Sequence, residues 1–139
     1  MNGHTVYGIY VTGNSGNVAY RNNSTNGVAT VDMAETIYMV VDGKRYSSQC
    51  CFDYGNAETA NVDDGNATME ALYWGSDTTW GGKGDGTGPW VAAYLESGVY
   101  KGNKGGWKTT TTWPNCKTIN ATFATTMLKG PSGVRGDES

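Results

Sequence analysis

The chain has 139 residues, enough for one domain of ordinary size. Gly, Thr, Asn and Ser together supply 59 of these residues and Leu only three, a balance that argues against a helical bundle and favours strands joined by turns. The net charge is −3 and the Lys and Arg residues are scattered, so the sequence lacks the basic patch expected of a protein that binds nucleic acid or an anionic membrane.

Alternation of apolar and polar residues is the dominant pattern and predicts five strands. In chain order, they cover residues 6–11, 36–41, 69–74, 90–100 and 119–128. Polar, glycine-punctuated loops are predicted between several of them, at residues 14–27, 75–89 and 101–115.

The predicted faces of three strands follow from the same alternation. The first strand places Tyr7, Ile9 and Val11 on one face. The fourth places Trp90, Ala92, Tyr94 and Glu96 together, and the fifth Ile119, Ala121, Phe123 and Met127.

We expect an all-β sandwich that forms a single domain over residues 1–139 and is incomplete in this chain. Five strands make only a small sheet, and a sandwich normally needs two sheets to bury its core. The sequence also stops at residue 139 soon after the last predicted strand, although a frayed polar tail explains this ending equally well.

Targeting signals are weak. The longest apolar runs span a few residues, and the first twenty residues lack a charged segment followed by an apolar one, so we expect neither a membrane helix nor a signal peptide within this chain. Four glycosylation sequons, which give weak support for secretion, begin at Asn22, Asn23, Asn66 and Asn120.

Cys50 and Cys51 are adjacent, and a disulfide between neighbours closes a strained eight-membered ring. Alternatively, one of them bonds Cys116, or all three stay reduced. His4 is the only histidine and no CxxC occurs, so zinc is not expected. Acidic residues in the loops lack the spacing of an EF-hand, and we expect no metal ion and no cofactor.

Trp80 and Trp90 flank one glycine-rich loop, and Trp107 and Trp113 lie within another. Exposed indole rings stack on the apolar faces of sugars, so these loops are candidate carbohydrate sites. The simpler interpretation is that each Trp fills the core of its own sheet.

Carboxylates are the natural catalytic groups in a chain with one histidine and no nucleophile elbow. Glu96 stands out because its strand face also carries Trp90, Ala92 and Tyr94. A carboxyl group beside aromatic rings can have a raised pKa or act as a nucleophile. The alternative is an ordinary solvated residue at a sheet edge.

The block from Cys50 to Thr59, CCFDYGNAET, resembles the signature of the catalytic domain of α-L-arabinofuranosidase B, glycoside hydrolase family 54. Similarity continues through residues 69–73, 79–81, 88–90 and 95–96, and upstream through 20–23 and 41–43. The resemblance covers nearly the whole chain and rests on the Cys-Cys block.

This resemblance implies a concanavalin-like jelly-roll β-sandwich that removes terminal arabinofuranosyl groups from arabinoxylan and arabinan with retention of configuration. It places the nucleophile at Glu96, a vicinal disulfide at Cys50–Cys51 against the sugar, and a sugar-contacting ring at Trp80. It also implies secretion, a polysaccharide partner, and contact with the remainder of the domain or with another chain.

Three departures from the family pattern concern activity. The family's general acid is an Asp beyond the end of this chain. Tyr94 stands where the family has an Asp in the sugar site, two positions before the nucleophile, and Ser97 stands where it has Asn. Both positions therefore count among the candidate substrate-binding residues.

The sequence leaves three hypotheses. The chain is part of a retaining glycosidase, a non-catalytic carbohydrate-binding sandwich, or a fragment with no function of its own. We prefer the first.

Overall fold

In the computed structural model, every regular element among the described residues is a β-strand, which confirms the all-β class. The structure describes residues 2–11, 19–30, 33–49, 52–57, 59–60, 69–79, 81–95, 98–100 and 112–132. Over these residues, no helix is long and apolar enough to cross a membrane. The strands are β1 (Glu35–Asp42), β2 (Asp53–Gly55), β3 (Glu70–Gly75), β4 (Lys83–Asp85), β5 (Trp90–Leu95), β6 (Gly98–Tyr100), β7 (Thr112–Lys117) and β8 (Phe123–Gly130).

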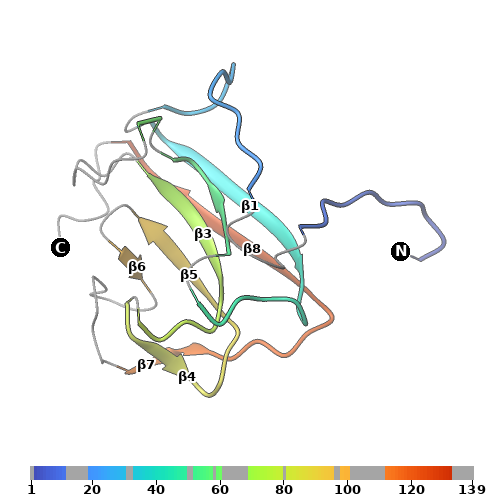
Figure 1. Ribbon diagram of the computed structural model, residues 1–139, viewed down its shortest axis with the longest axis vertical. Coiled ribbons are helices and arrows are strands. Elements are labelled where there is room, and N and C mark those ends of the chain that lie inside the picture. Colours follow the sequence, from blue (N-terminus) through green and yellow to red (C-terminus); the bar gives the residue numbers. More distant parts are fainter. Residues whose placement is uncertain are drawn as a thin grey trace.

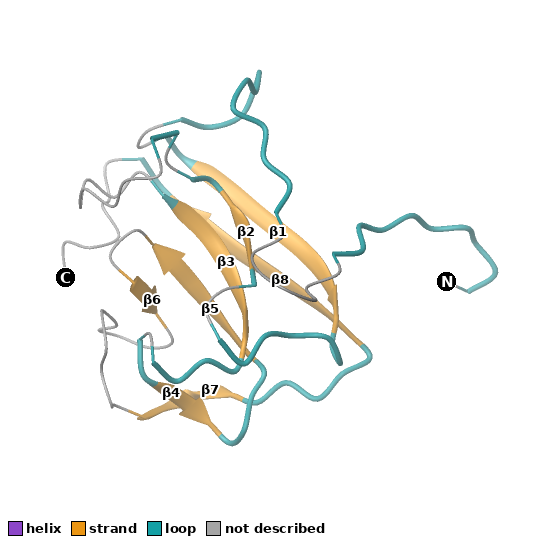
Figure 2. Cartoon of the chain, viewed as in Figure 1, coloured by secondary structure: helices purple, strands orange, loops and turns teal. Residues whose placement is uncertain are grey.

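The strands form three sheets (Figure 1). The largest is antiparallel, in the order β2-β3-β5-β6. The β1 and β8 strands make an antiparallel pair along their whole length, and β4 and β7 make a short parallel pair. Figure 2 shows the β4–β7 pair below the larger sheet, at the end where β5 begins.

The main core lies where the β1–β8 pair packs on β3. Met39 and Val41 of β1 meet Leu72 and Trp74 of β3, and Ala124 of β8 completes the buried cluster. The Trp74 indole is fully buried and donates a hydrogen bond from Nε1 to Arg45 O, 3.1 Å away. Two sheets joined by an apolar core are the layered arrangement expected of a sandwich.

Two predicted strands are confirmed, since residues 36–41 fall within β1 and residues 69–74 match β3 within one residue. The strand predicted at 6–11 is wrong. These residues have no regular structure, and Tyr7 and Ile9 are largely exposed. Alternation produces a strand only where a second strand supplies hydrogen-bonding partners, and none of the described segments pairs with this one.

Two other expectations about strands need correction. The predicted strand 90–100 is two strands, β5 and β6, which pair antiparallel with Leu95 opposite Gly98. The loops predicted at 75–89 and 101–115 contain β4 and the start of β7. Gly84 of β4 lies so close to the buried Trp90 ring that a Cβ would overlap it, so this strand is polar and glycine-rich for packing reasons.

The facing predicted for residues 119–128 is also wrong in part. Phe123 and Met127 are more than half exposed, whereas Ala124 and Thr126 are buried. The register explains this, because Ala124 and Thr126 lie opposite the core residues Val41 and Met39 of β1. The inner face of β8 is therefore formed by Ala124, Thr126 and Leu128, and Phe123 and Met127 turn outward.

Candidate functional site

The candidate site is the face of the β2-β3-β5-β6 sheet that points away from the main core. Directly paired residues point to the same side of a sheet. Asp53 pairs with Tyr73, and Tyr73 with Ala92. Two residues beyond Ala92 on β5, Tyr94 pairs with Val99. Tyr73, Ala92 and Val99 form a buried cluster on this face, with Tyr94 packed against it.

Tyr73 and Asp77 fix the turn that leads to the candidate Trp80. The fully buried Tyr73 hydroxyl accepts a hydrogen bond from Asp77 N at 2.9 Å. The buried Asp77 carboxylate in turn accepts one from Thr79 N at 3.2 Å. Burial, together with the negative charge of Asp77, raises the pKa of Tyr73 to about 12. Tyr73 therefore stays neutral, and its hydroxyl holds the turn in place.

Asp53 is the carboxyl group on this face that lies nearest to the Cys-Cys block in sequence. Its side chain reaches solvent, but loss of hydration against the sheet raises the pKa of the Asp53 carboxyl above its ordinary value. On this face Tyr73 is buried, whereas the half-buried Tyr94 side chain and the exposed Asp53 carboxyl reach the surface. This combination suits a neutral ligand rich in hydroxyl groups.

Most residues predicted for the site lie outside the described part of the chain, namely Cys50, Cys51, Trp80, Glu96 and Ser97. Tyr94 is described. It is half-buried and lies on the predicted face with Ala92. The residue after Trp80 also reaches this region, because Gly81, with φ of +71°, lies against the carbonyl of Val99, the partner of Tyr94.

Phe52, the residue after Cys51, lies toward the other end of β3 from the flank of Glu96. Phe52 O accepts a hydrogen bond from Trp74 N near one end of β3, whereas Leu95 pairs with Glu70 at the other end. Four residues of strand separate these positions, or about 13 Å at ~3.3 Å per residue. The structure therefore brings the flanks of Trp80 and Glu96 together, whereas Phe52 lies farther along β3.

Two of the four tryptophans at the predicted loops have structural roles. Trp90 is buried and donates from Nε1 to Asp85 O at 3.0 Å, as the simpler interpretation expected. Trp113 is half-buried and donates to Gly81 O at 2.8 Å. Trp107 lies outside the described residues.

Asp85 of β4 and Cys116 of β7 both make structural contacts. The exposed Asp85 pairs with Lys117, which lowers the pKa of the Asp85 carboxyl. The Cys116 thiol lies 3.5 Å from Val91 O in hydrogen-bonding geometry. Sequence reasoning missed Tyr73, although its alternation with Leu72 and Trp74 already placed it on the opposite face.

Known proteins resemble this chain closely. The sequence family described as "Alpha-L-arabinofuranosidase B, catalytic" matches residues 1–135. Alpha-L-arabinofuranosidase B of Aspergillus oryzae is 45% identical over 139 residues, which cover 98% of this chain and 26% of that protein. The enzyme of the same name from Emericella nidulans is 44% identical over 130 residues, covering 94% of this chain and 24% of its own.

Solved structures of arabinofuranosidases also resemble this chain. An arabinofuranosidase in complex with arabinofuranosyl-α-1,2-xylobiose is 42% identical, with a TM-score of 0.69 over 79% of this chain and 22% of that one. A Glu-to-Gln mutant of a glycoside hydrolase family 54 enzyme, soaked with 4-nitrophenyl α-L-arabinofuranoside, matches equally well. The chain spans about a quarter of the length of its curated relatives. On the match over residues 1–135, the chain belongs to the catalytic-domain family of α-L-arabinofuranosidase B.

Proposed function

We propose that this chain is part of a retaining glycoside hydrolase that releases terminal α-L-arabinofuranosyl residues from arabinoxylan or arabinan. The family match over residues 1–135 carries the proposal. The solved relatives support the ligand class, because one is complexed with arabinofuranosyl-α-1,2-xylobiose and another was soaked with 4-nitrophenyl α-L-arabinofuranoside. We further propose that residues 1–139 belong to one jelly-roll domain and that the protein is secreted.

In this proposal Glu96 is the nucleophile. Retaining glycosidases use two carboxyl groups about 5–5.5 Å apart, of which one attacks the anomeric carbon and the other protonates the leaving oxygen. Glu96 directly follows β5, whose last described residues place Tyr94 on the face shared with Tyr73 and Ala92. The general acid lies outside this chain, as the resemblance implies.

The remaining proposed residues bind the sugar. A Cys50–Cys51 disulfide and the Trp80 ring form walls that hold the furanose for in-line attack. Support for Trp80 comes from Gly81, which lies against Val99 and so brings this loop to the strands that flank Glu96. Tyr94 and Ser97 lie on either side of the nucleophile in sequence and tune the fit of the substrate.

A covalent trap tests the proposal. An arabinofuranosyl donor with a good leaving group needs little protonation, so the missing acid matters least in this experiment. After exposure of the folded protein to such a donor, intact mass should increase by one pentosyl group, and peptide mapping should locate it on Glu96. The same map reports whether Cys50 and Cys51 resist alkylation until they are reduced.

Two variants control the trap. Glu96→Gln should abolish the mass gain, and Glu138→Gln, which removes a carboxylate near the end of the sequence, should leave it unchanged. A folded protein that gains no pentosyl group would contradict a nucleophile in this chain. Saturable binding of arabinoxylan by that same unlabelled protein would favour the non-catalytic carbohydrate-binding sandwich instead.

A further inference from the structure

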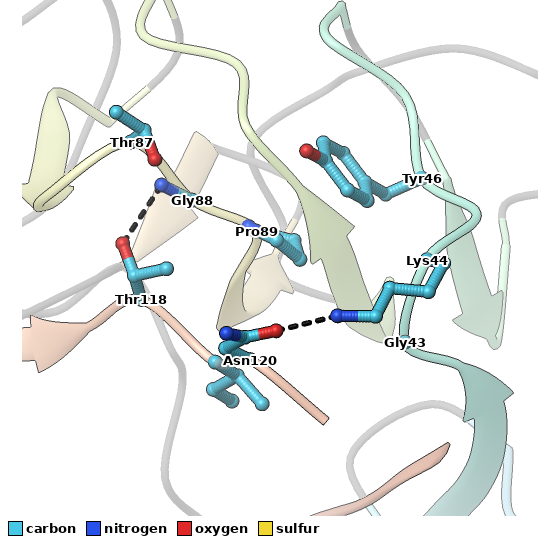
Figure 3. A pocket seen from close by; sticks show the side chains of 9 residues that line it. Gly43, Lys44, Tyr46, Thr87, Gly88, Pro89, Thr118 and Asn120 are labelled. Atoms are coloured by element: carbon cyan, nitrogen blue, oxygen red, sulfur yellow. Dashed lines mark hydrogen bonds between the residues drawn. The ribbon is translucent and has the colours of Figure 1, made fainter. Parts of the chain in front are cut away.

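A small polar pocket lies where β5 begins, at the end of the strand away from Leu95. Its walls come from three loops, at residues 43–46, 87–89 and 118–120, and its volume is about 200 Å³ (Figure 3). Pro89 directly precedes β5 and Leu95 ends it. Six residues of strand separate the two, or about 20 Å at ~3.3 Å per residue. The pocket is therefore separate from Leu95, the last described residue before Glu96 in the sequence.

The three loops are tied together by the backbone. Gly43 N donates to Thr122 O at 2.8 Å, and Ile119 N donates to Pro89 O at 2.9 Å. The Thr118 hydroxyl accepts from Gly88 N at 2.9 Å. A Cβ on Gly43 would overlap the carbonyl of Ala121, so glycine is needed for this close approach. The pocket is thus held in shape before any ligand arrives, which reduces the entropy cost of binding.

The walls combine rings with hydrogen-bonding groups. In Figure 3 the Tyr46 ring and Pro89 line one part of the pocket, while Thr87 and Thr118 lie across from Tyr46. At its base the Lys44 ammonium donates to Asn120 Oδ1. An ammonium has three donors and an amide nitrogen two, so this pair keeps N–H groups for a ligand. Tyr46 is 44% exposed and accessible for stacking.

This chemistry fits a sugar ring. Aromatic and proline rings take the apolar C–H face, while hydroxyl, amide and ammonium groups bind the sugar hydroxyls. The volume is below the ~300 Å³ at which pockets for drug-sized ligands begin, so it suits one monosaccharide unit rather than an oligosaccharide. Lys44 is the single charged residue among those that line the pocket, and it already contacts an amide oxygen.

We propose that this pocket is a second, non-catalytic carbohydrate site that binds one neutral pentose unit of the polysaccharide. The choice of a pentose rests on the proposed function, whereas the pocket itself does not. Such a site holds the polymer on the surface at a distance from the reacting bond. This raises the effective concentration of the substrate without changing the chemistry.

Nuclear magnetic resonance titration of the folded protein tests this proposal. With xylobiose and xylotriose as probes, the ring signals of Tyr46 and the side-chain amide signals of Asn120 should shift in a saturable manner. Tyr46→Ala should weaken binding at least tenfold, whereas Tyr46→Phe keeps the ring and should stay within about threefold. Tyr38→Ala is the matched control, because Tyr38 is an exposed tyrosine on β1 outside the pocket.

Three results would overturn the proposal. The first is the absence of saturable shifts at these signals, and the second is binding that Tyr46→Ala leaves intact. The third is displacement of the sugar by inorganic phosphate, which would identify an anion site at Lys44. If Tyr46→Ala does not fold, Lys44→Gln should weaken the sugar binding instead. Glu96→Gln should leave these shifts unchanged, so failure of the covalent trap and failure of this site can be told apart.

Discussion

At the scale of single residues, the Tyr73 hydroxyl links the candidate face to the turn that follows β3. It is fully buried and accepts the hydrogen bond from Asp77 N. Tyr73→Phe removes the acceptor and leaves a buried N–H without this partner, which costs about 1–3 kcal/mol. We expect the free energy of unfolding, measured by urea denaturation, to fall by that amount. Tyr54→Phe, on the exposed β2 strand, should leave it unchanged.

The same residue makes stability depend on pH in the alkaline range. The pKa of Tyr73 is raised to about 12 in the folded protein, against an ordinary value of 10.0. The folded state therefore binds the phenolic proton more tightly than the unfolded state does. The stability that this tighter proton binding adds to the folded state is fully present below pH 10 and is lost as the pH rises toward 12. The wild-type protein should lose stability over this interval more steeply than Tyr73→Phe; parallel slopes would contradict the assignment.

At the scale of elements, the strands that the sequence predicts well are those with a full buried face. Residues 36–41 and 69–74 alternate clearly because β1 and β3 contribute Met39, Val41, Leu72 and Trp74 to one core. β4 and β7 carry little apolar signal, since they pair through the backbone around Gly84 and Trp113. The chain reversal between β5 and β6 shifts the alternation by one residue, because Tyr94 and its partner Val99 share a face. The prediction of one continuous strand over residues 90–100 missed this shift.

The register between β1 and β8 determines which side chains of β8 are buried, and substitutions on its two faces can test it. Thr126 is buried opposite Met39, and within the described residues its hydroxyl has no hydrogen-bond partner. Thr126→Val removes a buried polar group at nearly constant volume. It should raise the free energy of unfolding by about 1 kcal/mol. Thr125→Val is the matched control, because Thr125 lies on the exposed face beside Val40, and the change should be close to zero. Equal effects of the two substitutions would contradict the register.

At the scale of the whole molecule, the limits of sequence reasoning lie in long-range contacts. The side of the sheet that carries Tyr94 follows from alternation, whereas the turn that Tyr73 fixes through Asp77 depends on side-chain hydrogen bonds that no pattern encodes. The pocket proposed to bind a pentose depends even more on long-range contacts. Lys44 and Asn120, which meet in it, are 76 residues apart in the sequence. A site assembled from three distant loops leaves no local motif in the sequence.

The outer face of the β1–β8 pair sets how the whole molecule behaves in solution. Tyr38 and Met127 are paired and exposed, and Val40 and Phe123 extend the same apolar face. Monomeric proteins rarely expose such a patch on a strand pair, because it favours association. We expect the 139-residue chain to self-associate with rising concentration, and Val40→Lys to reduce this effect in light scattering. Val28→Lys adds the same charge in an exposed loop, so it should leave association unchanged. If both substitutions act equally, net charge rather than this face controls the association.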